Sequence, residues 1–248
     1  MNTTGITHRT VEVNGLSLHL AEAGPADGPV VLLLHGFPEC WYSWRHQLLA
    51  LSAAGLRAVA PDQRGYARSD APEAVGAYSI LHLVGDAVGV LDAVGAERAV
   101  VVGHDWGAPV AWHTAQLRPD RVRGVVGLSV PFLPRGSTRP TEGLARRFGA
   151  GFYQLHFQAP GVADAELGAD PLTAAWNRVP IVSPALYVAG EHDMVVAGVP
   201  FEALVTSLRR SVTDLRDAVS LPGCGHWTQQ ERPAEVNRAV VDFVAGLA

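Results

Sequence analysis

The feature that most restricts the fold of this chain is a regular alternation of short apolar runs with longer amphipathic segments. Runs rich in Val and Leu predict strands at residues 29–36, 56–62, 98–105, 122–131, 185–193 and 215–223, of which 29–36 and 185–193 should be buried. Helical patterns follow five of these six runs, and two earlier segments, 9–15 and 16–24, predict a hairpin. This order predicts an α/β fold, with a mostly parallel eight-stranded sheet and helices on both faces.

One irregular segment interrupts the alternation. The pattern stops after Pro131 and resumes with the apolar run that begins at Ala185, and the 53 residues between them mix glycines, prolines and short amphipathic pieces. We therefore expect one structural domain with an inserted lid. Residues 1–131 would form the first part of the core, 132–184 a partial lid, and 185–248 the second part of the core.

Composition narrows the class of partner. The net charge is −5 and only 17% of the residues are charged, so no basic surface for nucleic acid is expected. The first 15 residues lack the apolar core of a secretory signal, and no run is long enough to span a membrane. We expect a cytoplasmic protein with a small-molecule substrate, in which Cys40 and Cys224 are free thiols.

The sequence between Gly103 and Gly107 is the first candidate for chemistry. In open α/β sheets, ligands bind beyond the carboxyl ends of the strands. This Gly-x-Asp-x-Gly stretch begins at the end of the predicted strand 98–105. Small flanking residues allow the tight turn that usually exposes a nucleophilic serine, and here the central residue is Asp105. The amide of Trp106 would face developing negative charge, although an aspartate at this place can also serve only as a helix N-cap.

The ends of three further predicted strands carry residues that could act together with Asp105. His-Gly-Phe-Pro at 35–38 offers the Phe37 amide as a second oxyanion-hole donor, although it can equally be a turn chosen for backbone shape, and a cis Phe37–Pro38 bond fits there. Asp193 ends the predicted strand 185–193, and His226 follows the last strand. The order nucleophile, acid, histidine is that of the α/β-hydrolases.

Other polar residues near these exits receive lesser roles. Glu191 is a second candidate for the acid, but we prefer Asp193, which ends the predicted strand. His104 and His192 lack metal-ligand partners at suitable spacing, so we interpret both as structural and expect no metal or cofactor.

An aspartate nucleophile selects the substrate class. With an ordinary pKa of about 3.9, a carboxylate is ionised at neutral pH, and its attack on a saturated carbon gives an ester. His226, oriented by Asp193, would then activate water against that ester. An epoxide and a haloalkane both fit; an epoxide oxygen needs a proton donor, whereas a halide needs only N–H donors.

The stretches 35–47, 60–70, 100–112, 152–167 and 221–237 resemble soluble epoxide hydrolases of the α/β-hydrolase superfamily. The resemblance implies Asp105 as nucleophile, Asp193 and His226 as its partners, and Phe37 and Trp106 as oxyanion-hole amides. It also implies an epoxide and water as reactants. Haloalkane dehalogenases share the aspartate turn but tend to carry asparagine where this chain has Phe37.

The lid departs from that family pattern. Epoxide hydrolases hold the epoxide oxygen with two lid tyrosines, and the position of the first is His156 here, with Tyr153 three residues earlier. Residues 170–175 run directly into 176–186, so the part of the lid that would carry the second tyrosine is missing, and Tyr187 is expected in the core. We expect weakened epoxide hydrolysis by a monomer or homodimer. The alternatives are a haloalkane dehalogenase and a catalytically silent ligand-binding protein.

Overall fold

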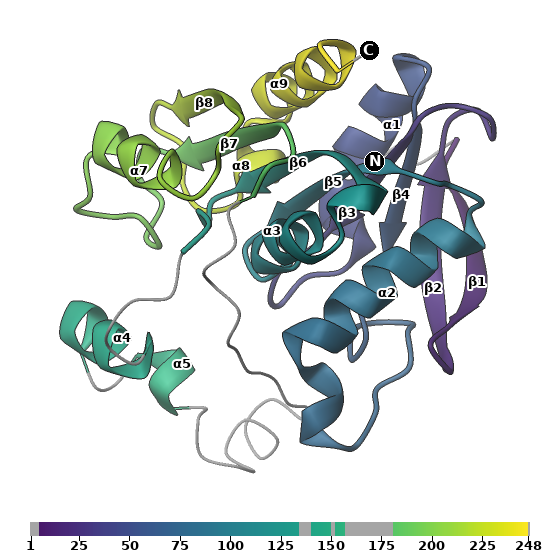
Figure 1. Cartoon of the computed structure of the whole chain (residues 1–248), viewed down its shortest axis with the longest axis horizontal. Coiled ribbons are helices and arrows are strands. Elements are labelled where there is room, and N and C mark those ends of the chain that lie inside the picture. Colours follow the sequence, from purple (N-terminus) through teal and green to yellow (C-terminus); the bar gives the residue numbers. More distant parts are fainter. Residues whose placement is uncertain (1–4, 134–139, 150–151, 157–180, 248) are drawn as a thin grey trace.

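A computed structural model describes residues 5–133, 140–149, 152–156 and 181–247. These residues form an eight-stranded sheet with the order β1-β2-β4-β3-β5-β6-β7-β8 (Figure 1). The strands are β1 (Thr7–Val13), β2 (Leu16–Ala23), β3 (Val30–Leu34), β4 (Arg57–Pro61), β5 (Ala99–His104), β6 (Val122–Leu128), β7 (Ala185–Gly190) and β8 (Leu215–Leu221). All eight predicted strands are confirmed.

The strand directions also match the expectation. β2 is antiparallel to both β1 and β4, whereas every other neighbouring pair is parallel. The opening hairpin turns at Asn14 and Gly15, which have φ values of 52° and 75°. Positive φ at both turn positions is the geometry that Asn-Gly favours, so these two residues set the register of β1 on β2.

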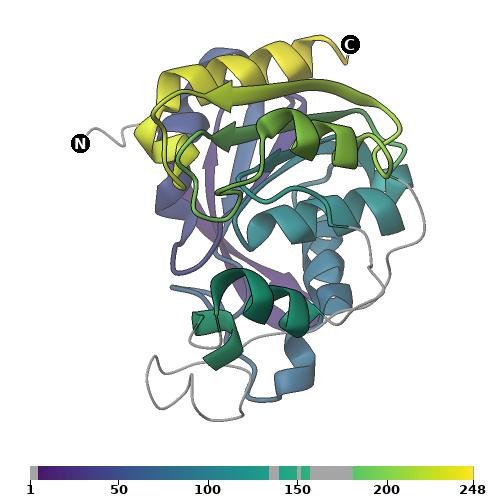
Figure 2. The ribbon, with the colours of Figure 1, turned by 90° about the vertical axis from the view of Figure 1, so that its left-hand side faces the viewer.

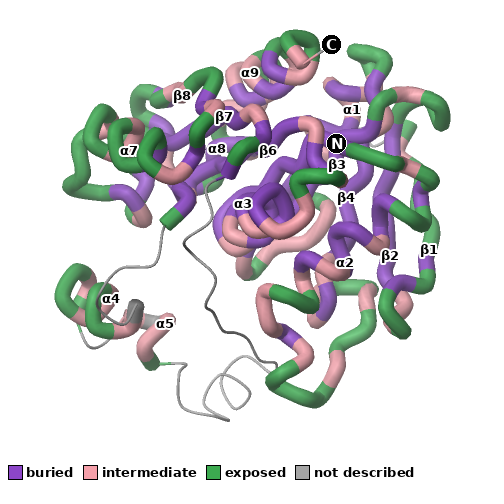
Figure 3. The backbone as a smooth tube through the Cα atoms, in the orientation of Figure 1, coloured by how far each residue is buried: buried purple, intermediate pink, exposed green. Residues whose placement is uncertain are grey.

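Helices cover both faces of the sheet. On one face lie α2 (Ile80–Ala93), α3 (Gly107–Leu117) and α7 (Phe201–Leu208); on the other lie α1 (Arg45–Ala53) and α9 (Pro233–Ala245), with the short α8 (Thr228–Glu231) just before α9. Each face has its own apolar layer. In β5, Val101 packs into the first layer, whereas Val100 and Val102 pack into the second. The central strands are therefore buried on both sides, as their uninterrupted apolar sequences predict (Figure 3).

The described part of the predicted lid consists of α4 (Pro140–Phe148) and α5 (Tyr153–His156), which lie outside the two helical layers (Figures 1 and 2). Arg147 of α4 donates a hydrogen bond to the Ala197 carbonyl in the loop after β7 (2.9 Å). The rest of the predicted lid, residues 134–139, 150–151 and 157–180, lies outside the described residues.

Two smaller expectations concern cysteines and membranes. Cys40 and Cys224 are both free, and Cys224 is buried. Among the described helices, none has both the length and the apolar character needed to cross a bilayer.

Candidate active site

Asp105 lies at a sharp turn between β5 and α3. Its φ is +49°, a left-handed conformation that is unusual for a residue with a Cβ. The turn also needs its two glycines. A Cβ on Gly103 would lie 2.1 Å from the Gly107 carbonyl oxygen, and a Cβ on Gly107 would lie 2.1 Å from the Leu34 carbonyl oxygen. The Gly-x-Asp-x-Gly pattern is therefore required by close backbone contacts, and it presents Asp105 at the end of β5.

The Asp105 carboxylate faces backbone amides. The Phe37 N–H donates to Asp105 Oδ1 at 2.8 Å, and the Trp106 N–H also hydrogen-bonds this carboxylate. The Phe37–Pro38 bond is cis, as expected. Position 36 requires glycine, because a Cβ added there would lie 2.4 Å from the Asp105 Cβ. The structure thus brings both candidate oxyanion-hole amides to the predicted nucleophile.

His226 lies between two carboxylates. Its Nε2 is 3.3 Å from Asp105 Oδ2, and its Nδ1 is 3.0 Å from Asp193 Oδ1. Asp193 is fully buried, and the Val195 N–H donates to the same Oδ1 at 2.9 Å. Loops after β5, β7 and β8 therefore assemble the three residues in the arrangement predicted from the sequence.

The charges of this group stabilise one another. Burial alone would lower the pKa of His226, but its hydrogen bonds with Asp105 and Asp193 raise it to about 9. Burial opposes ionisation of both aspartates; hydrogen bonds from His226, supplemented by backbone N–H groups, outweigh it and lower both pKa values. At neutral pH the resting site therefore holds an imidazolium between two carboxylates.

The lesser candidates are placed as expected. The Glu191 side chain is exposed and accepts a hydrogen bond from the Gly223 N–H, away from His226. His192 is also exposed. His104 is buried beside the site, where its Nε2 hydrogen-bonds the His226 carbonyl oxygen at 2.9 Å. Tyr187 is fully buried in the core.

Two residues near His226 were not identified as candidates from the sequence. Ser129, directly after β6, places its Oγ 2.8 Å from His226 Nδ1. Glu39 accepts a hydrogen bond from His104 Nδ1 at 3.2 Å and another from Gln230, linking the loop after β3 to α8. The signal for Ser129 was a polar residue at the carboxyl end of a buried strand, the same criterion that identified Asp105 and Asp193.

The two candidate proton donors lie in the segment predicted to form the lid. Tyr153 is the first residue of α5 and His156 is its last, and the His156 side chain is exposed. The side chain of Tyr153 lies outside what the structure describes.

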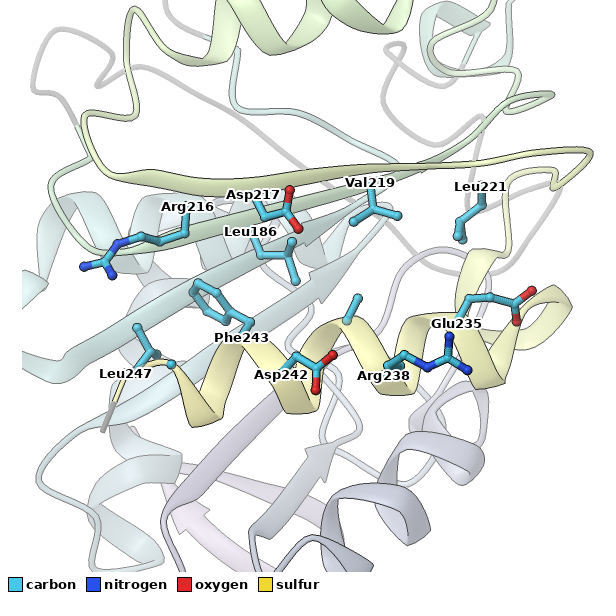
Figure 4. A pocket seen from close by; sticks show the side chains of 12 residues that line it. Leu186, Arg216, Asp217, Val219, Leu221, Glu235, Arg238, Asp242, Phe243 and Leu247 are labelled. Carbon is cyan, nitrogen blue, oxygen red and sulfur yellow. The ribbon is translucent and has the colours of Figure 1, made fainter.

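A groove of about 510 Å³ lies elsewhere, between β8 and α9 (Figure 4). Arg216, Asp217 and Val219 line one side, and Arg238 and Phe243 line the other. None of the residues that line this groove belongs to the group around Asp105. No cluster of three or more potential metal ligands occurs among the described residues.

Known proteins share this fold. The family model for the alpha/beta hydrolase fold matches residues 29–160. Epoxide hydrolase A of Mycobacterium tuberculosis is 38% identical over 97% of this chain and 98% of its own length. An epoxide hydrolase from Vigna radiata superimposes with a TM-score of 0.90 at 34% identity, covering 99% of this chain and 100% of that one. This chain belongs to the epoxide hydrolases.

Two further epoxide hydrolases are similar to this chain over nearly its whole length. Epoxide hydrolase 3 of Siraitia grosvenorii is 35% identical over 96% of this chain and 98% of its own length. The crystallised enzyme from an endophytic Streptomyces is 38% identical, with a TM-score of 0.89, over 98% of this chain and 96% of that one. The match to the Mycobacterium enzyme extends over 319 aligned positions, 71 more than the 248 residues here. That relative therefore contains stretches without a counterpart in this epoxide hydrolase.

Proposed function

We propose that this protein hydrolyses small apolar epoxides to vicinal diols through a covalent ester on Asp105. The observation that carries the proposal is the position of the His226 ring, 3.3 Å from the Asp105 carboxylate and 3.0 Å from that of Asp193. A ring so placed can serve both the nucleophile and the water that later attacks the ester. A silent binding protein has no need of this arrangement.

The first step uses one particular oxygen of Asp105. Because Oδ1 already accepts the Phe37 N–H, Oδ2 is the oxygen available for attack. Oδ2 forms a bond to a ring carbon of the epoxide, the carbon–oxygen bond of the ring breaks, and the released oxygen takes a proton from an acid. We propose Tyr153 or His156 as that acid, since both lie on the lid segment.

Ester formation switches the role of His226. Before attack, the negative charge of Asp105 helps to keep the ring protonated. Alkylation removes that charge, so the pKa of His226 falls and the ring releases its Nε2 proton to solvent. A neutral imidazole, still oriented by Asp193, is then present at the step that needs a base.

Hydrolysis of the ester restores the enzyme. His226 Nε2 removes a proton from water, whose oxygen attacks the carboxyl carbon of Asp105. The charge that develops on Oδ1 faces the amides of Phe37 and Trp106, and each such donor is worth roughly 3–4 kcal/mol. The bond between the carboxyl carbon and Oδ2 then breaks, so Oδ2 leaves with the substrate and takes the proton from His226 to complete the diol. The new carboxyl group of Asp105 gives its proton back to His226, and the acid that protonated the epoxide oxygen regains its proton from solvent, which restores the resting enzyme.

The lid sets the expected efficiency. We propose that residues 132–184 form a shortened lid, supported by the 71 aligned positions by which the Mycobacterium match exceeds this chain. A less enclosed site admits water and weakens electrostatic stabilisation, so we expect slower turnover than in a relative with a longer lid. Epoxides are favoured over haloalkanes because the relatives named above are epoxide hydrolases. As expected from the sequence, we propose a cytoplasmic monomer or homodimer.

Diol formation from styrene oxide, measured by chromatography, tests the proposal. Asp105→Ala removes the nucleophile and should abolish diol formation. Glu191→Gln is the matched control, because it neutralises an exposed carboxylate outside the site, and its rate should stay within about twofold of the natural protein. Unchanged activity in Asp105→Ala would overturn the proposal.

A further inference from the structure

We propose that Ser129 is a positioning residue for His226 and assists hydrolysis of the Asp105 ester. The inference rests on the proposed function above. Its starting point is the contact between Ser129 Oγ and His226 Nδ1, which at 2.8 Å is shorter than the 3.0 Å contact between the same Nδ1 and Asp193 Oδ1. Ser129 is fully buried, so the contact is shielded from water.

The backbone of Ser129 is held in an unfavourable conformation. Its φ is +73°, and the Val130 N–H donates to the Leu128 carbonyl oxygen at 2.9 Å across it. This combination defines a γ-turn with positive φ, which is rare and strained for a residue other than glycine. Strain of this kind persists only where the surrounding structure enforces it, and it concentrates at functional sites.

Two buried aromatic residues enforce the turn. The Tyr187 hydroxyl donates to the Ser129 carbonyl oxygen at 3.1 Å, and the Trp112 indole N–H donates to the Val130 carbonyl oxygen at 3.0 Å. The Ser129 N–H donates in turn to the Val188 carbonyl oxygen at 2.8 Å. Both aromatic side chains are fully buried in the same apolar layer, and both fix carbonyl groups of the turn. The direction of the Ser129 side chain is therefore set by the core.

The hydroxyl of Ser129 is suited to join His226 and Asp193. Its oxygen can accept the Nδ1–H of His226, while its own proton is directed to the Asp193 carboxyl, whose pKa it helps to lower. Asp193 Oδ2 is buried and has no hydrogen-bond partner within the distance limits among the described residues.

This arrangement matters most when His226 becomes charged. As the ring takes a proton from water, its Nδ1–H is shared by Asp193 and Ser129, and the ring is kept from rotating. The titratable groups that face the ring are Asp105, Asp193 and His104, and in the ester state Asp105 is neutral. Loss of the Ser129 acceptor should therefore destabilise the imidazolium and make His226 a weaker base at that stage.

Single-turnover kinetics separates this role from a structural one. The natural protein, Ser129→Gly and Ser129→Ala are mixed with styrene oxide, and the mass of the Asp105 peptide is followed with time at several pH values. Ser129→Gly removes the hydroxyl and suits the positive φ, so it should fold. Ala67→Gly is the matched control, because it relieves a φ of +46° at an exposed residue that has no proposed role in the reaction.

We expect the ester to form within about twofold of the natural rate in both Ser129 variants and to decay roughly 10- to 100-fold more slowly, as for loss of a hydrogen bond to a charged group. The acidic limb of the decay profile should move to lower pH, whereas Ala67→Gly should leave both steps unchanged. Decay at the natural rate with an unmoved limb, or equal slowing of both steps, would overturn the role of Ser129 alone. Absence of any ester in the natural protein would overturn the proposed function as well.

Discussion

The residues proposed for the two halves of the reaction lie in regions of different construction. Asp105 directly follows β5, whereas Asp193 and His226 lie in the loops after β7 and β8, and the interatomic distances of 3.0 and 3.3 Å are maintained by the sheet. Tyr153 and His156 lie on the four-residue helix α5, outside both helical layers (Figure 2). The comparison shows why a shortened lid can leave the ester-hydrolysing group intact while it alters the supply of the ring-opening proton.

The largest effect on turnover is expected for a residue that the sheet positions. His226→Gln removes the base but leaves Asp105 as a nucleophile, so the ester should form and persist. Turnover should fall by more than roughly 10⁴-fold, since residues that act as a unit are each indispensable. Mass spectrometry of the intact protein after exposure to styrene oxide would show one added equivalent of substrate. A His226→Gln protein that turns over normally and carries no added mass would contradict the division of roles.

A smaller effect is expected on the lid side. General acids contribute typically 10²- to 10⁴-fold, and water in an open site can replace part of that contribution. We expect Tyr153→Phe or His156→Gln, whichever removes the acid, to slow ester formation by about 10²-fold while ester decay stays unchanged.

Rapid-quench measurement of the two steps checks this prediction. Natural rates of ester formation in both single variants and in the double variant would show that the lid does not supply the proton. Slowed decay with unchanged formation would show that these residues act on the other half of the reaction.

The smallest effect concerns stability. The pKa of His226 is about 9 in the folded protein and about 6.5 when unfolded, so its protonation favours the folded state. This contribution, on the order of 2 kcal/mol because the ring is partly solvated, is complete below pH 6.5 and is lost as pH rises through 9. Urea unfolding at a series of pH values should show that loss. The same decline in His226→Gln would assign it to other groups.

The sequence predicts the triad because its chemistry follows from position. Parallel strands end at one edge of a sheet, so residues that follow β5, β7 and β8 converge although they are far apart in the chain. The Gly-x-Asp-x-Gly stretch adds a backbone requirement that is readable from two glycines. Both arguments use local sequence, and the structure brings the three residues that they select close together.

Ser129 could not be assigned in the same way. Its orientation depends on a positive φ that is held by Tyr187, 58 residues later, and by Trp112. The sequence shows only a serine at a strand exit, where most polar residues simply face solvent. The link from His104 through Glu39 to Gln230 likewise joins the end of β5, the loop after β3 and α8. Such partners are selected by packing, which the order of residues does not reveal.

The central claim is that Asp105 itself takes part in the reaction as a nucleophile. One turnover of styrene oxide in oxygen-18 water, followed by mass analysis of the Asp105 peptide, tests it most directly. Water attacks the carboxyl carbon of the ester, so the account predicts oxygen-18 in the Asp105 carboxylate and none in the diol formed on that first turnover. Label in the diol, with an unlabelled Asp105 peptide, would show direct attack of water on the epoxide and would contradict the account.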